Sequence, residues 1–588
     1  MKPLVVALCA LIAGEVLADQ PATAPPDPAQ VKFQWGVKIP LRDGIKLNAT
    51  VYTPRQQKAP APCVFTLTPY ISQSYHDRGM YFAAHGYPFL TVDVRGRGNS
   101  EGQFRPLLQE ARDGHDVVEW LAQQPYCNGK VTMWGGSYAG YDQWVTAKEF
   151  PPHLATIVPV ASPYAGIDFP MRGNIASTYN MQWLTFTSGR ASQESIFGDD
   201  VFWRAKNREW FESGAPFRQL DTLVGNPSAT FQEWVAHPAM DAYWDSYNPT
   251  AEQYAKLSIP ILTITGHYDG DQPGAIEHYR QYMKNTDAAG RARHYLIIGP
   301  WDHAGTRTPQ AQFGNLTFGP ASLVDLPKLH LEWYAWTMQG GPKPQFLQKH
   351  VAYYVMDTDQ WRYADTLEAV TAESRPYYLD SVANATDVLA SGSLGAARAK
   401  GKPDRYVYDP RDVSIAAVEA VTDPASLTDQ HWVHATRGKQ LVYHTAPFER
   451  DTEVSGFFKL SAWLAIDQPD TDFGVLVYEV RPDGSSVFLT SDVRRARYRE
   501  DLRTAKLVTT REPLRYDFNG FTFTSRMLRQ GSRLRLVIGP VNSLYSQKNY
   551  NSGGEVSDET MRDARTVTVQ LYHDAAHPSA LYVPLGQP

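Results

Sequence analysis

The chain has 588 residues, of which 43% are hydrophobic and 20% charged, and its formal net charge is −6. This length is too great for a single core and predicts two to four domains, while the composition is that of a soluble globular protein. The basic residues form no long run, so we do not expect a nucleic-acid partner. No HExxH motif is present and the three cysteines are scattered, so we expect neither a metal nor an organic cofactor.

The first 18 residues, MKPLVVALCALIAGEVLA, have the pattern of a secretory signal peptide. Lys2 supplies a positive charge, Pro3 to Ile12 form a short apolar segment, and small residues precede Asp19. The apolar segment is shorter than the roughly 20 residues that a membrane span needs. We therefore expect cleavage and export, to a periplasm or beyond, with no stable membrane span after processing.

Two cysteines, Cys63 and Cys127, remain after this cleavage. An oxidising compartment would permit a disulfide between them. Both lie near the starts of predicted strands, and we expect two buried free thiols rather than a bridge.

Residues 31–162 alternate between apolar strands and helical patterns. The segments VFTLTPY and YPFLTVDVRG are almost continuous in apolar residues, which is typical of strands covered on both faces. Between such strands, ARDGHDVVEWLAQQP carries one apolar helical stripe. The alternation resumes over residues 258–347 in ILTITGHYDG and RHYLIIGPWDHAG. Together the two stretches predict one α/β domain on a mostly parallel sheet.

The remaining segments differ in pattern from this α/β domain. Residues 163–257 contain aromatic-rich helical stretches such as YNMQWLTFTS and few strand signals, which predicts an inserted helical cap. From residue 348 to 588 short strands alternate in polarity, with a hairpin turn at Pro482–Gly484. Many short strands separated by turns predict a β-sandwich of the jelly-roll type.

The segment WGGSYAG, residues 134–140, follows the strand KVTMW and precedes a helical pattern. A nucleophile on a sharp strand-to-helix turn needs small residues two positions before and after it. Gly135 and Ala139 meet this requirement around Ser137. A glycine turn with a capping serine would look the same, so the partners of Ser137 must decide.

A serine hydroxyl becomes a good nucleophile when a histidine accepts its proton and an acid orients that histidine. In α/β-hydrolases the acid and then the histidine follow the serine, each in a loop after a later strand. Asp269 and His303 occupy two such loops in this order. Asp271 and Asp302 are rival acids, and His267 is a weaker rival base; Asp302 is adjacent to His303, which makes its geometry awkward.

The reaction of such a serine also needs two donors for the developing negative charge. The backbone N–H of Tyr138, which follows the nucleophile, is one. The second should come from the loop after the strand that ends in TLTPY. Tyr70 occupies this position. A tyrosine here could be an oxyanion donor or a core residue with a hydrogen-bonded hydroxyl, and the sequence favours neither role.

Seven motifs resemble those of the CocE/NonD group of serine hydrolases, which is related to X-Pro dipeptidyl-peptidases, cocaine esterase, α-amino-acid ester hydrolases and glutaryl-cephalosporin acylases. The resemblance implies an α/β-hydrolase domain, a helical cap and a C-terminal jelly roll. By motif position it implies Ser137 as nucleophile, Asp269 as acid and His303 as base, with Tyr70 and the Tyr138 amide as oxyanion donors. The motifs span the mature chain and are TPY (68–70), DVRGRGNSEG (93–102), GGSYAG (135–140), HPAMDAYW (237–244), GHYDG (266–270), GPWDH (299–303) and DTDFGVLVYEVRPDG (470–484).

The substrate contacts are harder to predict. His267 stands where relatives often have an aromatic or apolar residue, so we expect a different pocket wall. The α-amino-acid ester hydrolases hold a substrate ammonium with a carboxylate cluster, for which Asp168 and Asp271 are candidates here. Gln272 interrupts the full cluster, and solvated or capping roles explain both acids as well. Cap aromatic residues, with Trp183, Phe186 and Trp244 as candidates, should shape the acyl pocket.

The sequence therefore predicts an exported serine hydrolase that cleaves an acyl ester or amide of a small molecule or short peptide. An X-Pro dipeptidyl-peptidase or an α-amino-acid ester hydrolase is the alternative within enzymes, and a non-catalytic binding protein is the alternative outside them. We interpret DVRGRGNSEG as a structural turn rather than a direct contact through Arg95.

Overall fold

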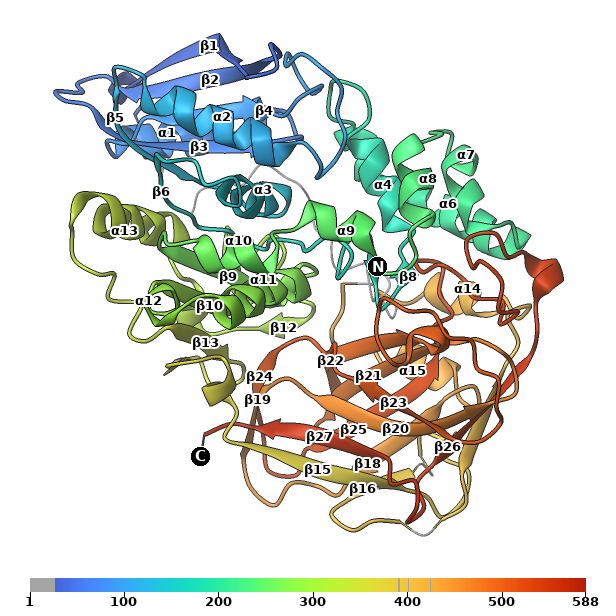
Figure 1. The fold of residues 1–588 in the computed structure, drawn as a ribbon. Helices are drawn as coiled ribbons and strands as arrows, with labels where there is room; N and C mark the ends of the chain where they lie inside the picture. The colour runs from blue at the N-terminus through green and yellow to red at the C-terminus, as the bar shows by residue number, and fades with distance from the viewer. Residues whose placement is uncertain (1–26, 390–391, 400, 424, 588) are drawn as a thin grey trace.

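The computed structural model describes residues 27–389, 392–399, 401–423 and 425–587. The predicted signal peptide lies outside these residues. Among the helices that are described, none combines the length and the apolar character needed to cross a membrane. Figure 1 shows the α/β domain in blue to green-yellow, and the C-terminal β-domain in yellow, orange and red below and to its right.

The α/β domain is built on one continuous sheet. Two hydrogen-bonded sets, β1-β2-β4-β3-β5-β6 and β9-β10-β13-β14, meet where Ile157 and Val160 bridge to Ile261 and Ile264 of β9. The interior pairs are parallel and the pairs at both edges are antiparallel. In sheet order the strands are β1 (Val31–Pro40), β2 (Lys46–Pro54), β4 (Phe89–Asp93), β3 (Ala61–Thr68), β5 (Cys127–Met133), β6 (Leu154–Thr156), β9 (Ile261–Tyr268), β10 (His294–Asp302), β13 (Val351–Val355) and β14 (Gln360–Ala364).

Helices cover both faces of this sheet, as the continuous apolar strands predicted. Along β3, Val64 packs into the core that α1 and α13 share, while Phe65 and Leu67 pack into the core of α2 and α3. This alternation follows from the two-residue period of a strand. The helices of the domain are α1 (His76–Ala84), α2 (Glu110–Ala122), α3 (Tyr138–Ala147), α11 (Gln272–Asn285), α12 (Ala288–Arg291) and α13 (Leu326–Gln339).

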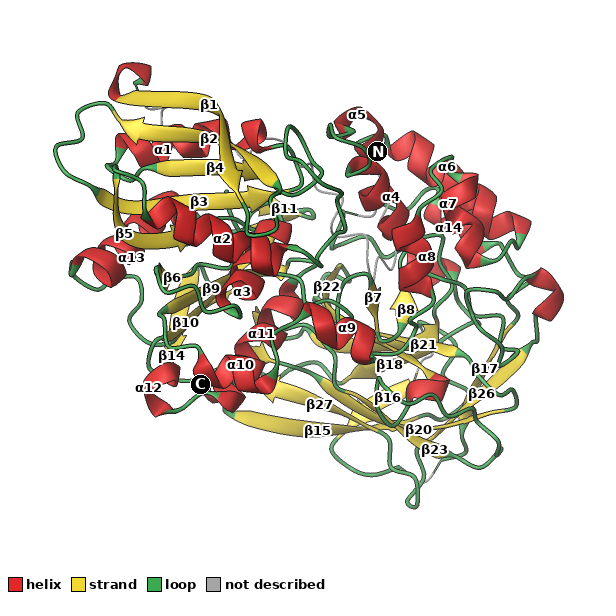
Figure 2. Cartoon of the chain, turned by 45° about the horizontal axis from the view of Figure 1, so that its top comes forward, coloured by secondary structure: helices red, strands yellow, loops and turns green. Residues whose placement is uncertain are grey.

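Between β6 and β9 the chain forms a helical segment, which we call the cap. Figures 1 and 2 both place α4, α6 and α8 above the C-terminal β-domain and beside the α/β domain. Two short strands, β7 (Met171–Arg172) and β8 (Ile175–Ala176), precede the helices. The helices are α4 (Tyr179–Phe186), α5 (Glu194–Phe197), α6 (Asp200–Ser213), α7 (Leu220–Leu223), α8 (Ala229–Val235), α9 (Ala242–Tyr247) and α10 (Ala251–Lys256).

The C-terminal domain consists mostly of β-strands, as predicted. Its strands form one hydrogen-bonded network in which almost all pairs are antiparallel, the pair β16–β18 being parallel. Two short helices, α14 (Ile415–Glu419) and α15 (His431–Ala435), accompany them. The strands are β15 (Glu373–Asp380), β16 (Gly392–Gly395), β17 (Asp404–Tyr408), β18 (Leu441–Thr445), β19 (Thr452–Gly456), β20 (Lys459–Ile466), β21 (Asp472–Val480), β22 (Ser486–Arg495), β23 (Leu514–Phe518), β24 (Thr524–Leu528), β25 (Arg533–Pro540), β26 (Val567–Tyr572) and β27 (Ala580–Leu585).

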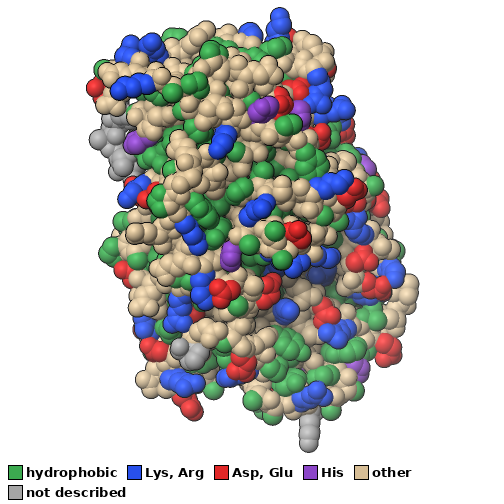
Figure 3. Space-filling view, turned by 60° about the vertical axis from the view of Figure 1, so that its left-hand side comes forward, with side chains coloured by type: hydrophobic (Ala, Val, Ile, Leu, Met, Phe, Trp, Pro, Cys, Tyr) green, Lys and Arg blue, Asp and Glu red, His purple; other side chains and the backbone are tan. Residues whose placement is uncertain are grey.

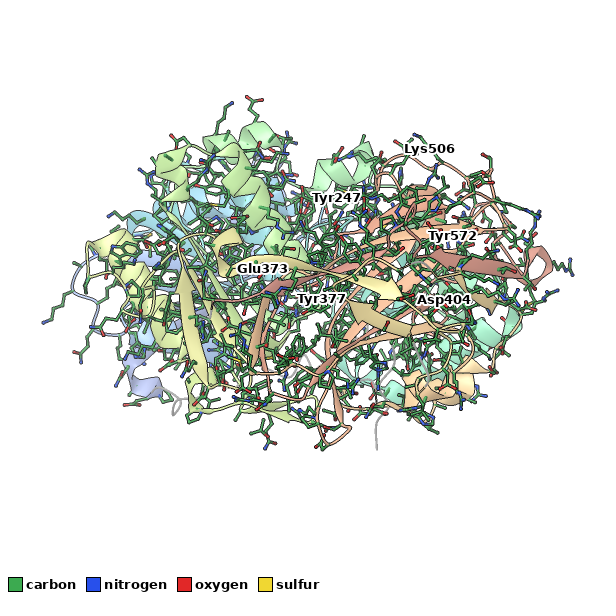
Figure 4. The ribbon with its side chains drawn as sticks, turned by 90° about the horizontal axis from the view of Figure 1, so that it is seen from below. Tyr247, Glu373, Tyr377, Asp404, Lys506 and Tyr572 are labelled. Atoms are coloured by element: carbon green, nitrogen blue, oxygen red, sulfur yellow. The ribbon has the colours of Figure 1, made fainter. Side chains whose placement is uncertain are left out.

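A buried carboxylate joins several strands of this β-domain. Asp404, labelled in Figure 4, accepts hydrogen bonds from the Tyr443 hydroxyl at 2.7 Å and the Ser381 hydroxyl at 2.7 Å, and lies 3.1 Å from His573 Nε2. Burial alone would raise the pKa of Asp404, but these hydrogen bonds lower it below its usual value. The ionised group therefore ties β17 to β18 and to the end of β26.

The cap is held to the β-domain by main-chain hydrogen bonds. Thr178 N donates to Tyr545 O at 3.1 Å and Gln547 N donates to Ala176 O at 2.8 Å. Arg218 N donates to Ser557 O at 3.1 Å. Bonds of this kind need a fixed relative position of the two segments, so the β-domain fixes where the cap lies.

On the face that Figure 3 shows, acidic and basic side chains are mixed.

Two findings bear on the sequence predictions. The segment HVAYYVMDTDQWRYA forms β13 and β14, and β13 pairs in parallel with β10. The hairpin that we assigned to the β-rich segment from residue 348 therefore extends the α/β sheet. The prediction was wrong because an alternating pattern does not reveal which sheet a strand joins.

Cys63 and Cys127 are both buried and unbridged.

Candidate active site

Ser137 lies between β5 and α3 in a left-handed backbone conformation, with φ 61° and ψ −126°. The turn needs small neighbours, as the motif predicted. A Cβ atom on Gly135 would lie 2.5 Å from Ala139 Cβ, and one on Gly140 would lie 2.3 Å from Val160 O. A larger residue at 135 would push the turn after β5 away from α3, and one at 140 would push α3 away from the segment that follows β6. The serine side chain remains partly exposed and lines a pocket.

Asp269 follows β9 and His303 follows β10, and their side chains are in contact. His303 Nδ1 lies 2.7 Å from Asp269 Oδ1. Asp269 also accepts hydrogen bonds from Thr265 Oγ1 at 2.8 Å and from Asp271 N at 3.0 Å. A carboxylate only accepts, so Nδ1 carries the proton and Nε2 is left as the basic ring atom. Of the rival acids, Asp302 instead accepts the Gly305 N–H at 2.8 Å.

The loop of His303 reaches the turn of Ser137. A Cβ atom on Gly136 would lie 2.5 Å from Arg307, four residues beyond His303. His303 is buried, which by itself lowers the pKa of its imidazole, but the hydrogen bond and charge of Asp269 and the charge of Asp271 outweigh burial. The net pKa of His303 is raised above its usual 6.5.

Two groups at the turn can donate to an anionic oxygen. Tyr138 is the first residue of α3, so its N–H has no acceptor within the helix. The Tyr70 hydroxyl is within hydrogen-bonding reach of Ser137 and accepts the Trp183 indole N–H at 3.0 Å. Burial raises the pKa of Tyr70, so its hydroxyl keeps its proton at neutral pH.

The pocket in front of Ser137 is partly open to solvent and has a volume of about 300 Å³, which includes part of that solvent. It is mostly aromatic, and Asp271 contributes its carboxyl group. Trp183 is the one predicted cap residue that lines it, while Phe186 instead stacks on the Tyr70 ring at 5.3 Å. The lining residues are Tyr70, Leu107, Ser137, Tyr138, Pro163, Phe169, Tyr179, Trp183 and Asp271.

The two candidate carboxylates for substrate binding differ in their surroundings. Asp168 accepts the backbone N–H groups of Tyr164 at 2.8 Å and Gly274 at 2.6 Å, so it joins the first residues of the cap to α11. The side chain of Asp271 is 5% exposed and lies 3.8 Å from His303 Nδ1. Burial, with the charges of Asp168 and Asp269, raises the pKa of Asp271 well above its usual range, although the charge of His303 lowers it.

Three predicted substrate contacts, Asp168, His267 and Trp244, are not among the lining residues. His267 faces the β-domain: its Nδ1 accepts the Ser525 N–H at 3.3 Å, and burial lowers the pKa of the ring to about 3. Trp244 is fully buried in the cap, where its indole donates to His237 O at 2.9 Å. The position of His267 on a strand and of Trp244 in an aromatic helix pattern does not reveal which side chains face the pocket. This explains why the predictions for these two residues were wrong.

Sequence reasoning missed four lining residues: Leu107, Pro163, Phe169 and Tyr179. Phe169 and Tyr179 belong to the aromatic-rich cap segment, and its composition was the only sequence signal that these residues could line the pocket. Leu107 has a left-handed backbone, φ 64°, in a loop that carries no motif.

The glycine-rich turn after β4 has a structural role, as predicted. Arg95 forms ion pairs with Asp113 at 2.6 Å and Asp43 at 2.7 Å. Arg97 is fully buried and donates to Pro69 O at 2.8 Å, beside Tyr70. Across the described part of the chain, no group of three or more His, Cys, Asp or Glu side chains is arranged to hold a metal ion.

Two family models match this chain. The model of the X-Pro dipeptidyl-peptidase (S15 family) matches residues 43–305. The model of the X-Pro dipeptidyl-peptidase C-terminal non-catalytic domain matches residues 346–582. The first of these ranges contains Ser137, Asp269, His303 and all the residues that line the pocket.

Individual proteins resemble the chain over nearly its whole length. Cocaine esterase of Rhodococcus sp. (strain MB1 Bresler) is 25% identical over 592 residues, which covers 93% of this chain and 98% of the esterase. An α-amino acid ester hydrolase structure has a TM-score of 0.80 and 21% identity, covering 97% of this chain and 99% of its own. An aminopeptidase of a marine sediment archaeon, Thaumarchaeota archaeon, has a TM-score of 0.79 and 20% identity with the same coverage. The two structures establish the shared fold. With the family models, these matches show that the chain belongs to the CocE/NonD type of serine hydrolases, in the S15 group of esterases and peptidases.

Proposed function

We propose that this protein cleaves acyl ester or amide bonds of small molecules or short peptides through Ser137, His303 and Asp269, with a covalent acyl-enzyme intermediate. The observation that carries the proposal is the 2.7 Å contact between His303 and Asp269, which leaves the basic Nε2 for the serine on the adjacent turn. The left-handed conformation of Ser137 and the pocket beside it support the same assignment.

The chemistry proceeds in two halves. Ser137 Oγ attacks the substrate carbonyl carbon while His303 Nε2 takes the hydroxyl proton, and Asp269 stabilises the resulting imidazolium. The negative charge on the carbonyl oxygen is held by the Tyr138 N–H and the Tyr70 hydroxyl. His303 then returns the proton to the leaving alcohol or amine as the bond to the carbonyl carbon breaks. Water, deprotonated by His303, releases the acid and restores Ser137.

The first prediction concerns Ser137 itself. Ser137→Ala removes the only nucleophile in this mechanism, so hydrolysis of p-nitrophenyl acetate should fall by at least about 10⁴-fold. Labelling by a fluorophosphonate probe should disappear as well. Ser74→Ala is a matched control, because Ser74 is exposed on the turn that follows Tyr70 and its hydroxyl donates to the main-chain carbonyls of Tyr70 and Ile71. Labelling that survives Ser137→Ala would refute the proposed nucleophile.

The second prediction concerns pH. The base His303 must be neutral, and its pKa is raised above 6.5, so kcat/KM should fall as pH decreases through a value above 6.5. An ionised Asp271 raises the pKa of His303, although burial of Asp271 opposes its ionisation, so Asp271→Asn should move the acid limb to lower pH. Rates with p-nitrophenyl acetate from pH 5 to 9 test both points. An acid limb that stays in place in the variant would contradict the coupling of Asp271 to His303.

Asp271 supports a second candidate function, in which the substrate carries a free amine. Its carboxyl group lines the pocket, and none of the hydrogen bonds found among the described residues uses its oxygens as acceptors. An ammonium group placed there would stabilise the ionised carboxylate, which burial otherwise disfavours. An X-Pro dipeptidyl-peptidase or an α-amino-acid ester hydrolase would use the site in this way.

The third prediction tests this candidate. Asp271→Asn should lower the ratio of kcat/KM for glycyl-prolyl p-nitroanilide to that for its N-acetylated form by about 10- to 100-fold, as expected for a charged hydrogen bond. The ratio cancels any general effect on His303. Asp168→Asn is the matched control, since Asp168 bonds main-chain amides and should alter thermal stability instead of this ratio. An unchanged ratio in Asp271→Asn would leave the simple esterase or acylase as the better assignment.

We also propose that the protein is exported, on the basis of the signal-like pattern of residues 1–18. The fourth prediction is that the protein recovered from a periplasmic extract begins at Asp19. N-terminal sequencing or intact mass measures this directly, and an extract whose protein retains Met1 would contradict cleavage.

A further inference from the structure

A side chain of the cap helix α4 contacts one of the two proposed oxyanion donors, the Tyr70 hydroxyl. Trp183 lies on this helix, and its indole N–H donates to the Tyr70 hydroxyl oxygen at 3.0 Å. Tyr70 itself belongs to the loop after β3 in the α/β domain. The contact therefore joins two segments that are more than a hundred residues apart in the chain.

This contact determines where the phenolic proton points. An indole nitrogen can only donate, so the Tyr70 oxygen must be the acceptor and its own proton must lie elsewhere. A phenolic O–H prefers the plane of its ring, which offers two directions. The Tyr70 ring is held by stacking on Phe186 at 5.3 Å and 20°, so these directions are fixed. Because the indole N–H donates to the oxygen, the phenolic proton must point away from the indole, and Ser137 lies within hydrogen-bonding reach of the same hydroxyl.

The indole is itself held in place. Its ring stacks on Tyr138 at 5.8 Å and 15° and on Trp234 of α8 at 6.3 Å and 27°. The Tyr138 ring is in turn anchored through its hydroxyl, which accepts the Leu107 N–H at 2.7 Å and donates to Glu110. The residue before the start of α4, Thr178, donates its N–H to Tyr545 O of the β-domain.

From these contacts we infer that Trp183 is a positioning residue of the oxyanion site: its N–H directs the Tyr70 O–H toward the developing negative charge and strengthens it as a donor. The strengthening is expected because a hydroxyl that accepts one hydrogen bond donates a better one. The inference rests on the proposed function of Ser137 and Tyr70. It assigns Trp183 a role in the rate of reaction besides its place in the pocket wall.

The test removes the N–H and keeps an aromatic ring. Trp183→Phe should lower kcat for p-nitrophenyl acetate by about 3- to 10-fold, the effect of one neutral hydrogen bond, with KM changed less than about twofold. The inhibition constant of phenylboronic acid, which forms a tetrahedral adduct with a serine, should rise by the same factor as kcat falls. A changed KM with an unchanged kcat would show that Trp183 only shapes the pocket, and would overturn the inference.

A double-variant cycle separates the two roles further. Tyr70→Phe removes the donor and should cost about 10²–10³-fold in kcat. If Trp183 acts through the Tyr70 hydroxyl, adding Trp183→Phe to Tyr70→Phe should cause no further loss. Losses that multiply in the double variant would mean that Trp183 acts independently of Tyr70, and the inference would be wrong.

Trp203→Phe is the matched control, because it removes an indole N–H that donates elsewhere in the cap, to Ile196 O at 2.6 Å, and Trp203 is not among the residues that line the pocket. It should retain the wild-type kcat, whereas a loss equal to that of Trp183→Phe would point to packing and overturn the inference. If Trp183→Phe does not fold, site-specific replacement of Trp183 by 3-benzothienylalanine removes only the N–H from the same shape and should give the same loss of kcat. Full activity of that variant would overturn the inference.

The variant Ser137→Ala distinguishes failure of this inference from failure of the proposed function. If it is inactive while Trp183→Phe has the full rate, only the role of Trp183 is refuted. If it retains turnover and boronate inhibition, the proposed chemistry is refuted, and the inference about Trp183 with it.

Discussion

The left-handed backbone of Ser137 is the constraint on which the rest of the site depends. A residue other than glycine with φ 61° costs on the order of 1–3 kcal/mol and persists only where the surroundings hold it. Here Ser137 N donates to Val160 O at 3.0 Å. Without a Cβ, Gly135 lets the turn after β5 approach Ala139 of α3, and Gly140 lets α3 approach Val160 in the segment after β6. The conformation presents the hydroxyl to the pocket and the Tyr138 N–H beside it. The loop of His303 packs against the same turn.

Three parts of the chain contribute to what surrounds this turn. The α/β sheet supplies Tyr70 and the turn itself, the cap supplies the Trp183 indole, and the β-domain holds the start of α4 through Tyr545. The C-terminal domain therefore has a physical connection to the proposed site, although none of its described residues lines the pocket. Its contacts fix the cap, and the cap holds the Trp183 indole against the hydroxyl of Tyr70, the proposed oxyanion donor.

Three buried aspartates near Ser137 show how hydrogen bonding assigns roles to one residue type. Asp269 accepts from a hydroxyl, a main-chain amide and His303, which suits the acid that orients the histidine. Asp168 accepts hydrogen bonds from two main-chain amides and so joins the first residues of the cap to α11. Asp271 lacks comparable donors within the described residues and faces the pocket. A carboxylate without donors is costly to bury, and such a group is therefore the one suited to meet a charged ligand.

The sequence by itself determined the order of elements and the residues of the strand ends. Small residues around Ser137, and Asp and His in loops after later strands, are local requirements that spacing reveals, so the turn and the Asp269–His303 pair could be predicted. The tertiary structure decided which side chains face the pocket. Trp183 and Trp244 have the same residue type in the same aromatic segment, yet one meets Tyr70 and the other is sealed inside the cap. It also decided that β13 joins β10 and that His267 faces β24. These outcomes depend on contacts between segments far apart in the chain, whose energies no local pattern records.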